Sequence, residues 1–330
     1  MSLRPIRLPQ DLIPAADMLM QTFQYPDHPE WGVQSDEQAA LVDSIRRMRR
    51  IWPIVRALQL VSPSLRDLAR GFVFEEGGRL VGLTLANREG LTSCWYIGTV
   101  GVLPGFRGRG IARQVLTATL EMMRKRRGER VRLGVINGNT PAQALYRSLG
   151  FADYGGSTRY AREAGSAPEP GALSERYEET PLREFDWRTR YELDRRIVPA
   201  EQQAYEPIVP ARYRTPAPIR LLAPLFRLAE NTKDRDVVVR DRASGQVVAR
   251  CGWTWPRTPK GMNSVRVRVD PAHAALSSYL VRRGLAEVTA RRPELRVDLF
   301  VPTWMPDAAR EAEALGFTRR TSNRLMGMKL

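Results

Sequence analysis

The sequence predicts an α/β fold (an α+β mixed sheet with helices on both faces) that occurs as two tandem domains. Strand-like segments dominate the early part of residues 1–162, and strand and helix patterns alternate in the later part. Residues 163–180 (EAGSAPEPGALSERYEET) have no apolar period and are typical of a linker. We therefore expect a first domain at 1–162, a linker at 163–176 and a second domain at 177–330.

The elements of the first domain follow from apolar periodicity and from turn residues. Gly77 and Gly78 mark a turn between two strands, and the apolar residues of 109–127 fall on one helical face. The expected elements are, in order, a strand at 3–8, helices at 10–23 and 36–59, strands at 71–76, 79–86 and 94–103, a helix at 109–127, a strand at 130–136, a helix at 140–149, and strands at 151–154 and 157–162.

Three pairs of segments indicate an internal duplication. IRLPQDLIPAADML (6–19) is similar to EETPLREFDWRTRYEL (178–193), and the paired strands of 71–86 are similar to those of 236–253. SLGFADYGGSTRY (148–160) is similar to ALGFTRRTSNRLM (314–326). The three similarities occur in the same order in both halves, so we expect the second domain to repeat the fold of the first.

Composition narrows the classes of function. The chain has 52 basic and 36 acidic residues, a net charge of +16, and all but four of the basic residues are arginine. The arginines are scattered, and their field favours anionic ligands. There is no helix-turn-helix or aromatic and basic strand motif, so we do not expect a nucleic-acid partner.

The same composition sets expectations for localisation and metals. No basic and apolar leader and no apolar run of ~20 residues is present, which predicts a cytoplasmic protein without a membrane partner. Cys94 and Cys251 are far apart in strand-like segments and are expected to be buried thiols. Two histidines and two cysteines form no ligand cluster, so no metal is expected.

The segment GVLPGFRGRGIARQVL (101–116) has the pattern of a phosphate-binding turn. Pro104 ends a strand, and Gly105, Gly108 and Gly110 allow the chain to turn tightly into a helix. The free amides of the first helical turn would then face a pyrophosphate, and the arginines at 107 and 109 would add charge. The segment has neither the nucleoside-triphosphate loop pattern nor the dinucleotide pattern.

A second motif follows after one strand, NGNTPAQALYRSLGF (137–151). Asn139 is at the N-cap position of a helix that carries Tyr146, and Gly150 ends this helix before Phe151. V-x-V-x-P-x-x-R-G-x-G-I-A and N-x-x-A-x-x-L-Y-x-x-L-G-F, in this order and at this spacing, resemble the GNAT superfamily of acetyl-CoA-dependent N-acyltransferases. The resemblance covers residues 1–162.

The resemblance implies acetyl-CoA as a co-substrate and assigns residues to it. The strand before the turn would hold the pantetheine arm and thioester through its main chain and diverge from its neighbour. Asn139 would contact the pantetheine, and Tyr146 would donate a proton to the departing thiolate as a general acid. The implied cofactor-binding residues are Val100, Val102, Arg107, Gly108, Arg109, Gly110, Ala112 and Asn139.

At the position where many relatives carry the general base, this sequence departs from the pattern of the family. Many relatives have a glutamate on this strand, and the matching position here is Tyr96. Two other routes to a neutral acceptor amine stay open: water could take its proton, or the amine could arrive already neutral. The loop of 24–37 is the other source of acceptor-site groups, and His28 has a pKa suited to a base. The candidates in this loop are Tyr25, Asp27, His28, Glu30 and Trp31.

The second domain lacks these motifs. Alignment of Pro104 with Pro271 places GFRGRGIA on AHAALSSY, and Asn139 and Tyr146 fall on Met305 and Ala312. We expect a GNAT-like domain without a cofactor site, which covers a strand edge of the first domain or helps to build the acceptor pocket, with residues 207–226 in its wall.

Two functions stay open. The first is an N-acetyltransferase that acts on the primary amine of a small-molecule or peptide acceptor, as a monomer or a homodimer. The second is a non-catalytic acyl-CoA-binding or scaffold module. The tandem layout is similar to that of the mycothiol synthase family, whose intact site lies in the other half.

Overall fold

The computed structural model describes residues 1–23, 31–32, 49, 52–57, 59–60, 63–217, 219–221, 223 and 231–330. The elements of the first half are β1 (Ser2–Pro5), α1 (Leu12–Thr22), α3 (Pro63–Arg66), β2 (Phe72–Glu76), β3 (Arg79–Arg88), β4 (Cys94–Val102), η2 (Pro104–Phe106), α4 (Ile111–Lys125), β5 (Arg130–Ile136), α5 (Thr140–Ser148) and β6 (Ala152–Arg162).

The second half has a similar order of elements. They are β7 (Tyr177–Pro181), α6 (Trp187–Ile197), α7 (Ala200–Gln203), α8 (Pro210–Tyr213), β8 (Thr232–Asp241), β9 (Val247–Pro256), β10 (Asn263–Val269), η3 (Pro271–His273), α10 (Leu276–Thr289), β11 (Val297–Pro302), α11 (Pro306–Ala314) and β12 (Thr318–Lys329). Both halves have the same order, as expected of a repeat: a strand, helices, three strands, a short 3-10 turn, a long helix, a strand, a shorter helix and a final strand.

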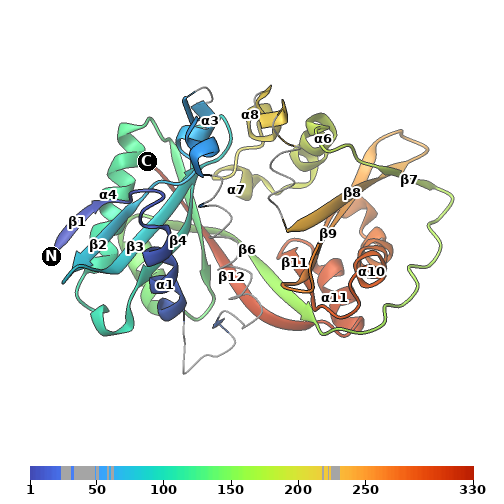
Figure 1. Cartoon of the computed structure of the whole chain (residues 1–330). Helices are drawn as coiled ribbons and strands as arrows, with labels where there is room; N and C mark the ends of the chain where they lie inside the picture. Colours follow the sequence, from blue (N-terminus) through green and yellow to red (C-terminus); the bar gives the residue numbers. More distant parts are fainter. Residues whose placement is uncertain are drawn as a thin grey trace.

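All the strands form one mixed sheet in which the two halves exchange their final strands. The order is β1-β2-β3-β4-β5-β12-β6-β11-β10-β9-β8-β7. β12 pairs with β5 of the first half, and β6 pairs with β11 of the second half. In Figure 1 both ends of the chain therefore lie on the first half, and β6 and β12 cross between the halves side by side. The second half does cover a strand edge of the first, as the sequence suggested.

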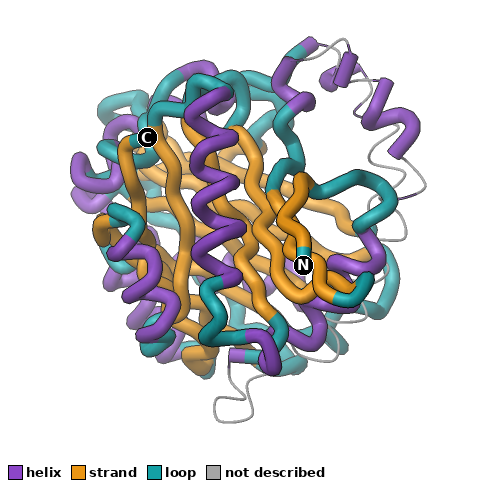
Figure 2. The backbone as a smooth tube through the Cα atoms, turned by 90° about the vertical axis from the view of Figure 1, so that its left-hand side faces the viewer, coloured by secondary structure: helices purple, strands orange, loops and turns teal. Residues whose placement is uncertain are grey.

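Helices cover both faces of the first half of the sheet. A Cβ at Gly82 of β3 would lie 2.4 Å from Ile111 Cγ2, so α4 begins directly against this strand. A Cβ at Gly101 of β4 would instead lie 3.1–3.3 Å from Thr22 and Leu19 of α1. Gly82 pairs with Val102, so Gly101 has the opposite orientation and α1 lies on the face opposite α4. Figure 2 shows the long helix α4 lying along the strands.

The exchanged strands take their side chains into the other half's core. Met326 of β12 is fully buried among Trp95, Leu116 and Leu133 of the first half. Tyr160 of β6 is 1% exposed and belongs to the core of the second half. Cys94 and Cys251 are free and buried, as the sequence predicted.

One predicted break in a strand is wrong. We expected strands at 151–154 and 157–162, separated at Gly155-Gly156, but β6 is continuous over Ala152–Arg162. Gly155 and Gly156 pair with Leu325 and Arg324 in the ladder. A Cβ at Gly156 would lie 3.0 Å from the carbonyl of Asn323, so the glycine permits close approach of two strands and does not mark a turn.

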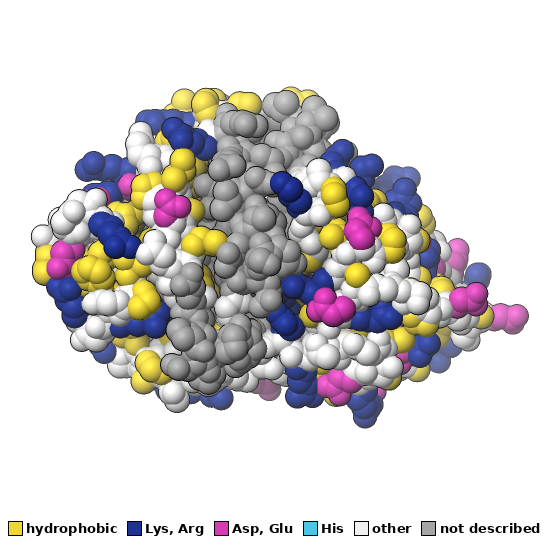
Figure 3. All heavy atoms as spheres, turned by 60° about the horizontal axis from the view of Figure 1, so that its bottom comes forward, with side chains coloured by type: hydrophobic (Ala, Val, Ile, Leu, Met, Phe, Trp, Pro, Cys, Tyr) yellow, Lys and Arg dark blue, Asp and Glu magenta, His cyan; other side chains and the backbone are white. Residues whose placement is uncertain are grey.

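The surface shows how the charge is distributed. On the face in Figure 3, Lys and Arg side chains are spread over both halves, with acidic side chains between them. Across the described ranges, no helix has both the length and the apolar character that a membrane crossing needs.

Candidate active site

A gap opens between the two parallel central strands of the first half. β4 and β5 pair over only four positions, from Cys94 with Arg130 to Ile97 with Leu133. Beyond Ile97 the strand β4 stays with β3, and beyond Leu133 the strand β5 stays with β12. A bulge at Gly98, which is skipped in the β3–β4 register, marks the point of divergence. This is the divergence that the sequence motif implied.

One edge of β4 faces this gap. The amide of Leu103 donates to the carbonyl of Val81 on β3 at 2.9 Å. Because main-chain groups of successive strand residues point to opposite edges, those of Val100 and Val102 face away from β3 and toward the gap. The carbonyl of Val102 also accepts from Nε of Arg107 at 3.3 Å.

The turn after β4 is held open by two glycines. Gly108 and Gly110 have φ values of 77° and 72°, and Gly110 is the N-cap of α4. A Cβ at either position would meet nothing within 4 Å, so the backbone conformation requires glycine and crowding does not. The amide of Gln114 donates to the carbonyl of Gly110 at 3.1 Å. The amides of residues 111–113 therefore precede the helical ladder, where an anion can bind them.

The two arginines of the turn form hydrogen bonds with other parts of the first half. Nη2 of Arg107 donates to the carbonyl of Thr22 at 2.9 Å, which ties the turn to the end of α1. Arg109 donates to both carboxylate oxygens of Glu76 at 3.1 and 2.9 Å and lies over the ring of Phe106. These contacts fix the shape of the turn.

The helix α5 and its N-cap carry two predicted residues beside the end of β5, and a third, Trp31, lies against the turn before this helix. Asn139 is its N-cap, and its side chain accepts from the amide of Ala142 at 3.3 Å. Tyr146 is 7% exposed, with its ring 5.9 Å from that of Phe151. Trp31 lies against Gly138, where a Cβ would be 3.1 Å from Trp31 Cζ2. Since β4 and β5 are parallel, this helix start and the glycine turn lie at the same edge of the sheet.

The second half has the same divergence of two parallel strands but lacks the glycine turn. β10 and β11 also pair over four positions, from Asn263 with Val297 to Arg266 with Phe300. Ala274 and Ala275 have helical φ values of −54° and −57° before α10. The carboxylate of Asp270 accepts from the amide of Ala272 at 3.0 Å, so an acidic group occupies the turn.

Comparisons with known proteins identify this arrangement. Residues 40–151 match the acetyltransferase (GNAT) family. The chain is 41% identical over 92 residues to N-alpha-acetyltransferase RimI of Mycobacterium tuberculosis, a match that covers 27% of this chain and 56% of that protein. It is 33% identical over 143 residues to mycothiol acetyltransferase of Thermobispora bispora, covering 42% of each. The chain thus spans about half the length of the curated relatives it matches.

Solved structures show the same fold over the whole chain. A tandem GNAT protein from the clavulanic acid biosynthesis pathway superposes with a TM-score of 0.63 at 16% identity, covering 99% of this chain and 98% of that one. A GCN5-related N-acetyltransferase from Sphaerobacter thermophilus gives a TM-score of 0.59, also at 16% identity, covering 99% and 95%. Residues 40–151 therefore match the acetyltransferase (GNAT) family, and the whole chain has the fold of tandem GNAT proteins.

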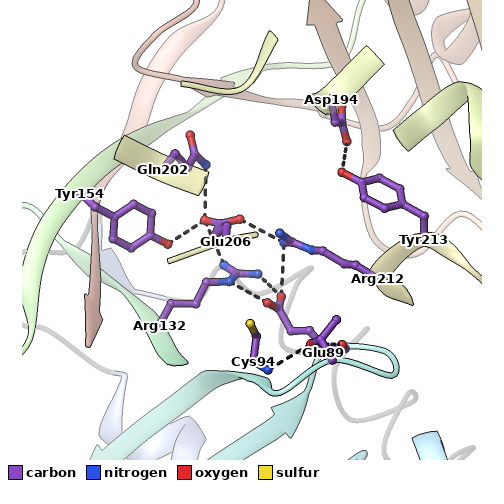
Figure 4. A network of polar contacts seen from close by, with 10 residues as sticks. Glu89, Cys94, Arg132, Tyr154, Asp194, Gln202, Glu206, Arg212 and Tyr213 are labelled. Carbon is purple, nitrogen blue, oxygen red and sulfur yellow. Dashed lines mark hydrogen bonds and ion pairs between the residues drawn. The ribbon is translucent and has the colours of Figure 1, made fainter. Parts of the chain in front are cut away.

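The GNAT fold here carries a polar network on the face opposite α4. Arg132 of β5 lies over the ring of Tyr96, with its guanidinium carbon 4.6 Å from the ring centre. Nε of Arg132 donates to Glu89 at 3.2 Å, and its Nη1 lies 3.5 Å from a carboxylate oxygen of Glu206. Glu206 also accepts from the hydroxyl of Tyr154 at 2.7 Å (Figure 4).

The second half supplies part of this network. Glu206 and Arg212 come from the segment between α7 and β8, and Nη2 of Arg212 donates to Glu206 at 3.1 Å and to Glu89 at 3.5 Å. The amide of Leu91 donates to the carbonyl of Ala211 at 3.4 Å. The described part of the 207–226 segment therefore contacts the β3–β4 turn of the first half.

Burial and charge set the protonation of the network. Although burial opposes it, the positive charges of Arg132 and Arg212 and the hydrogen bond from Tyr154 lower the pKa of Glu206 below its ordinary value. Burial and the charge of Glu206 raise the pKa of the Tyr154 phenol. Glu206 is thus a carboxylate held by cations, which makes it a weak proton acceptor.

Sequence reasoning missed Glu89, Arg132, Tyr154 and Glu206, because these residues lie far apart in the sequence, with 52 positions between Tyr154 and Glu206, and follow no motif. A signal was present in RVRLGV, where an arginine on a central strand needs a partner. Four of the predicted acceptor-site residues, Tyr25, Asp27, His28 and Glu30, lie outside the described residues. In the part of the chain that the structure describes, no group of three or more His, Cys, Asp or Glu could hold a metal ion.

Proposed function

We propose that the first half transfers an acetyl group from acetyl-CoA to the primary amine of a small-molecule or peptide acceptor. The observation that supports this most is the strand gap with two features at its edge, the glycine turn that opens α4 and the start of α5. GNAT proteins use an acyl-CoA co-substrate. A gap lined by main-chain groups suits a pantetheine arm, and an amide-rich turn suits its pyrophosphate.

The residues of the proposed cofactor site divide into two roles. The main-chain groups of Val100 and Val102 would bond to the pantetheine arm in the gap. The amides that follow Gly108 and Gly110, including that of Ala112, would bind the pyrophosphate. Arg107 and Arg109 would hold the turn in this shape through their contacts with Thr22 and Glu76, and Asn139 would contact the arm at the start of α5.

The proposed reaction forms one bond and breaks one. The amine nitrogen attacks the thioester carbonyl carbon, the C–S bond breaks, and the hydroxyl of Tyr146 protonates the departing thiolate. The proton lost from the amine leaves to water or to an acceptor-site group, or the amine arrives neutral. Glu89 and Glu206 are not suited to take it, because both carboxylates bond to arginines.

The second candidate function is an acyl-CoA-binding or scaffold module without catalysis. Tyr96 stands on β4 where many relatives have a glutamate, and β4 has no acidic residue. A thiol-release assay with acetyl-CoA and a panel of amines separates the two functions. Acetyl-CoA-dependent release with at least one amine supports the transferase. Binding of acetyl-CoA without release across the panel would support the module instead.

Calorimetry tests the cofactor site itself. We expect one acetyl-CoA per chain, because the turn of the second half carries Asp270 and helical alanines. Gly110→Val should abolish binding, since a branched side chain would cover the amides. Gly316→Val is the matched control, because Gly316 has a φ of 79° and an equally open surrounding, but lies in the second half. Equal loss of binding in both variants, or none in Gly110→Val, would remove the turn from the cofactor site.

A further inference from the structure

The second half carries two arginines directly opposite one another on adjacent strands. Arg250 of β9 pairs in register with Arg268 of β10, and both side chains are half-buried. Like charges at opposed positions of an antiparallel pair destabilise a sheet. Their presence here therefore calls for a compensating anion.

In the first half, the positions equivalent to Arg250 and Arg268 hold apolar residues. The amide of Asp270 donates to the carbonyl of Val248, as that of Leu103 does to Val81, so Arg250 and Arg268 occupy the places of Leu83 and Gly101. In the first half that pair packs under α1 in the apolar core. In the second half α6 takes the place of α1, and two arginines replace the apolar contact.

In the part of the chain that the structure describes, the neighbouring arginines have side-chain partners but these two do not. On the same face of the sheet, Arg190 pairs with Asp236 at 2.9 Å, and Arg266 donates to Thr254 at 3.0 Å. Within the described residues, Arg268 donates only to the carbonyl of Val267, at 3.0 Å, and Arg250 has no hydrogen bond or ion pair. Burial lowers the pKa of Arg268, and the charge of Arg250 acts in the same direction, while the charges of Asp194 and Glu206 oppose this shift.

A carboxylate oxygen without a partner lies in the same region. Oδ2 of Asp194 on α6 accepts from the hydroxyl of Tyr213 at 2.8 Å, as Figure 4 shows beside Arg212. Its Oδ1 is buried and accepts no hydrogen bond from any described group. Asp194 acts electrostatically on Arg268 without reaching ion-pair distance. Buried polar atoms normally have a hydrogen-bond partner. The unpaired Oδ1 therefore points to a ligand between the carboxylate of Asp194 and the two arginines.

We propose that Arg250, Arg268 and Asp194 form a binding site in the second half for a small carboxylate with a neighbouring hydroxyl or ammonium group. The carboxylate would accept charge-assisted hydrogen bonds from the two guanidinium groups. The neighbouring group would donate to Oδ1 of Asp194. The proposal for this site does not rest on the acyl transfer proposed for the first half.

Three dicarboxylate probes test the site on the full chain at constant ionic strength. L-malate carries a hydroxyl beside a carboxylate, L-glutamate carries an ammonium, and glutarate carries neither. We expect L-malate or L-glutamate to raise the Tm and glutarate to have a smaller effect. Arg268→Gln should weaken binding by calorimetry about tenfold or more. Arg266→Gln, on the same strand and face, should bind as the wild type does.

Stability without any probe gives a second and separate readout. An arginine kept for binding costs stability, so ligand-free Arg268→Gln should melt at the same temperature as the wild type or higher. Arg250→Gln should behave likewise, and both variants should bind acetyl-CoA normally. The proposal is overturned if neither L-malate nor L-glutamate binds, if Arg266→Gln loses binding equally, or if both ligand-free variants melt lower than the wild type.

Discussion

The exchange of β6 and β12 predicts that mutations act on the half opposite to their place in the sequence. Met326 lies near the end of the chain but is fully buried in the first half's core. Met326→Ala removes a buried side chain and leaves a cavity, so the free energy of unfolding should fall by about 2–5 kcal/mol. Tyr160→Ala should cost a similar or larger amount, of about 3–5 kcal/mol by analogy with other buried aromatic residues, in the second half.

Hydrogen exchange read strand by strand distinguishes the two effects. Met326→Ala should increase exchange first in β4 and β5, and Tyr160→Ala should do so in β10 and β11. Lys329→Ala, an exposed change on β12, serves as the control and should change stability by less than about 0.5 kcal/mol. If each variant instead loosens the half that contains it in sequence, or if Met326→Ala costs less than its control, the exchange is refuted.

Two further predictions concern catalysis and pH. Tyr146→Phe removes one hydroxyl and little volume, so turnover of a cognate amine should fall by roughly 10²–10⁴ while acetyl-CoA affinity stays constant, with Tyr160→Phe as the control; unchanged turnover would exclude Tyr146 as the acid. Because the folded state lowers the pKa of Glu206, its ionised form stabilises the fold at neutral pH, and this contribution should disappear as the pH falls through the lowered pKa. The stability difference between the wild type and Glu206→Gln should therefore shrink in acid denaturation series, and a difference that is constant with pH would contradict the assignment.

Local sequence patterns predicted the elements around the site. The strand at 130–136 was predicted with its observed bounds, and the helix at 140–149 ends one residue earlier than expected. The capping role of Asn139 was also predicted, because an N-cap depends on the residues within one turn. These features need no knowledge of distant parts of the chain.

The strand exchange could not be predicted from the same patterns. The segments that contain β6 and β12 resemble each other, and periodicity does not specify which of two similar sheet edges a strand joins. The network of Glu89, Arg132 and Glu206 was missed for the related reason that the tertiary fold alone brings these charges together. The Arg250 and Arg268 pair was visible only once the register of β9 and β10 was known.

The crossed strands also govern how the molecule is made. β5 of the first half is finished early in translation, but its neighbour β12 is synthesised after every other strand of the sheet. Until then the nascent chain presents an unpaired strand edge next to the gap between β4 and β5, which is a surface prone to aggregation. A cut between β6 and β7 would separate each half from the strand that closes its core, so we expect neither piece to fold as it does in the whole chain. Loss of β12 would therefore disturb a site whose other strands lie in the first half of the sequence.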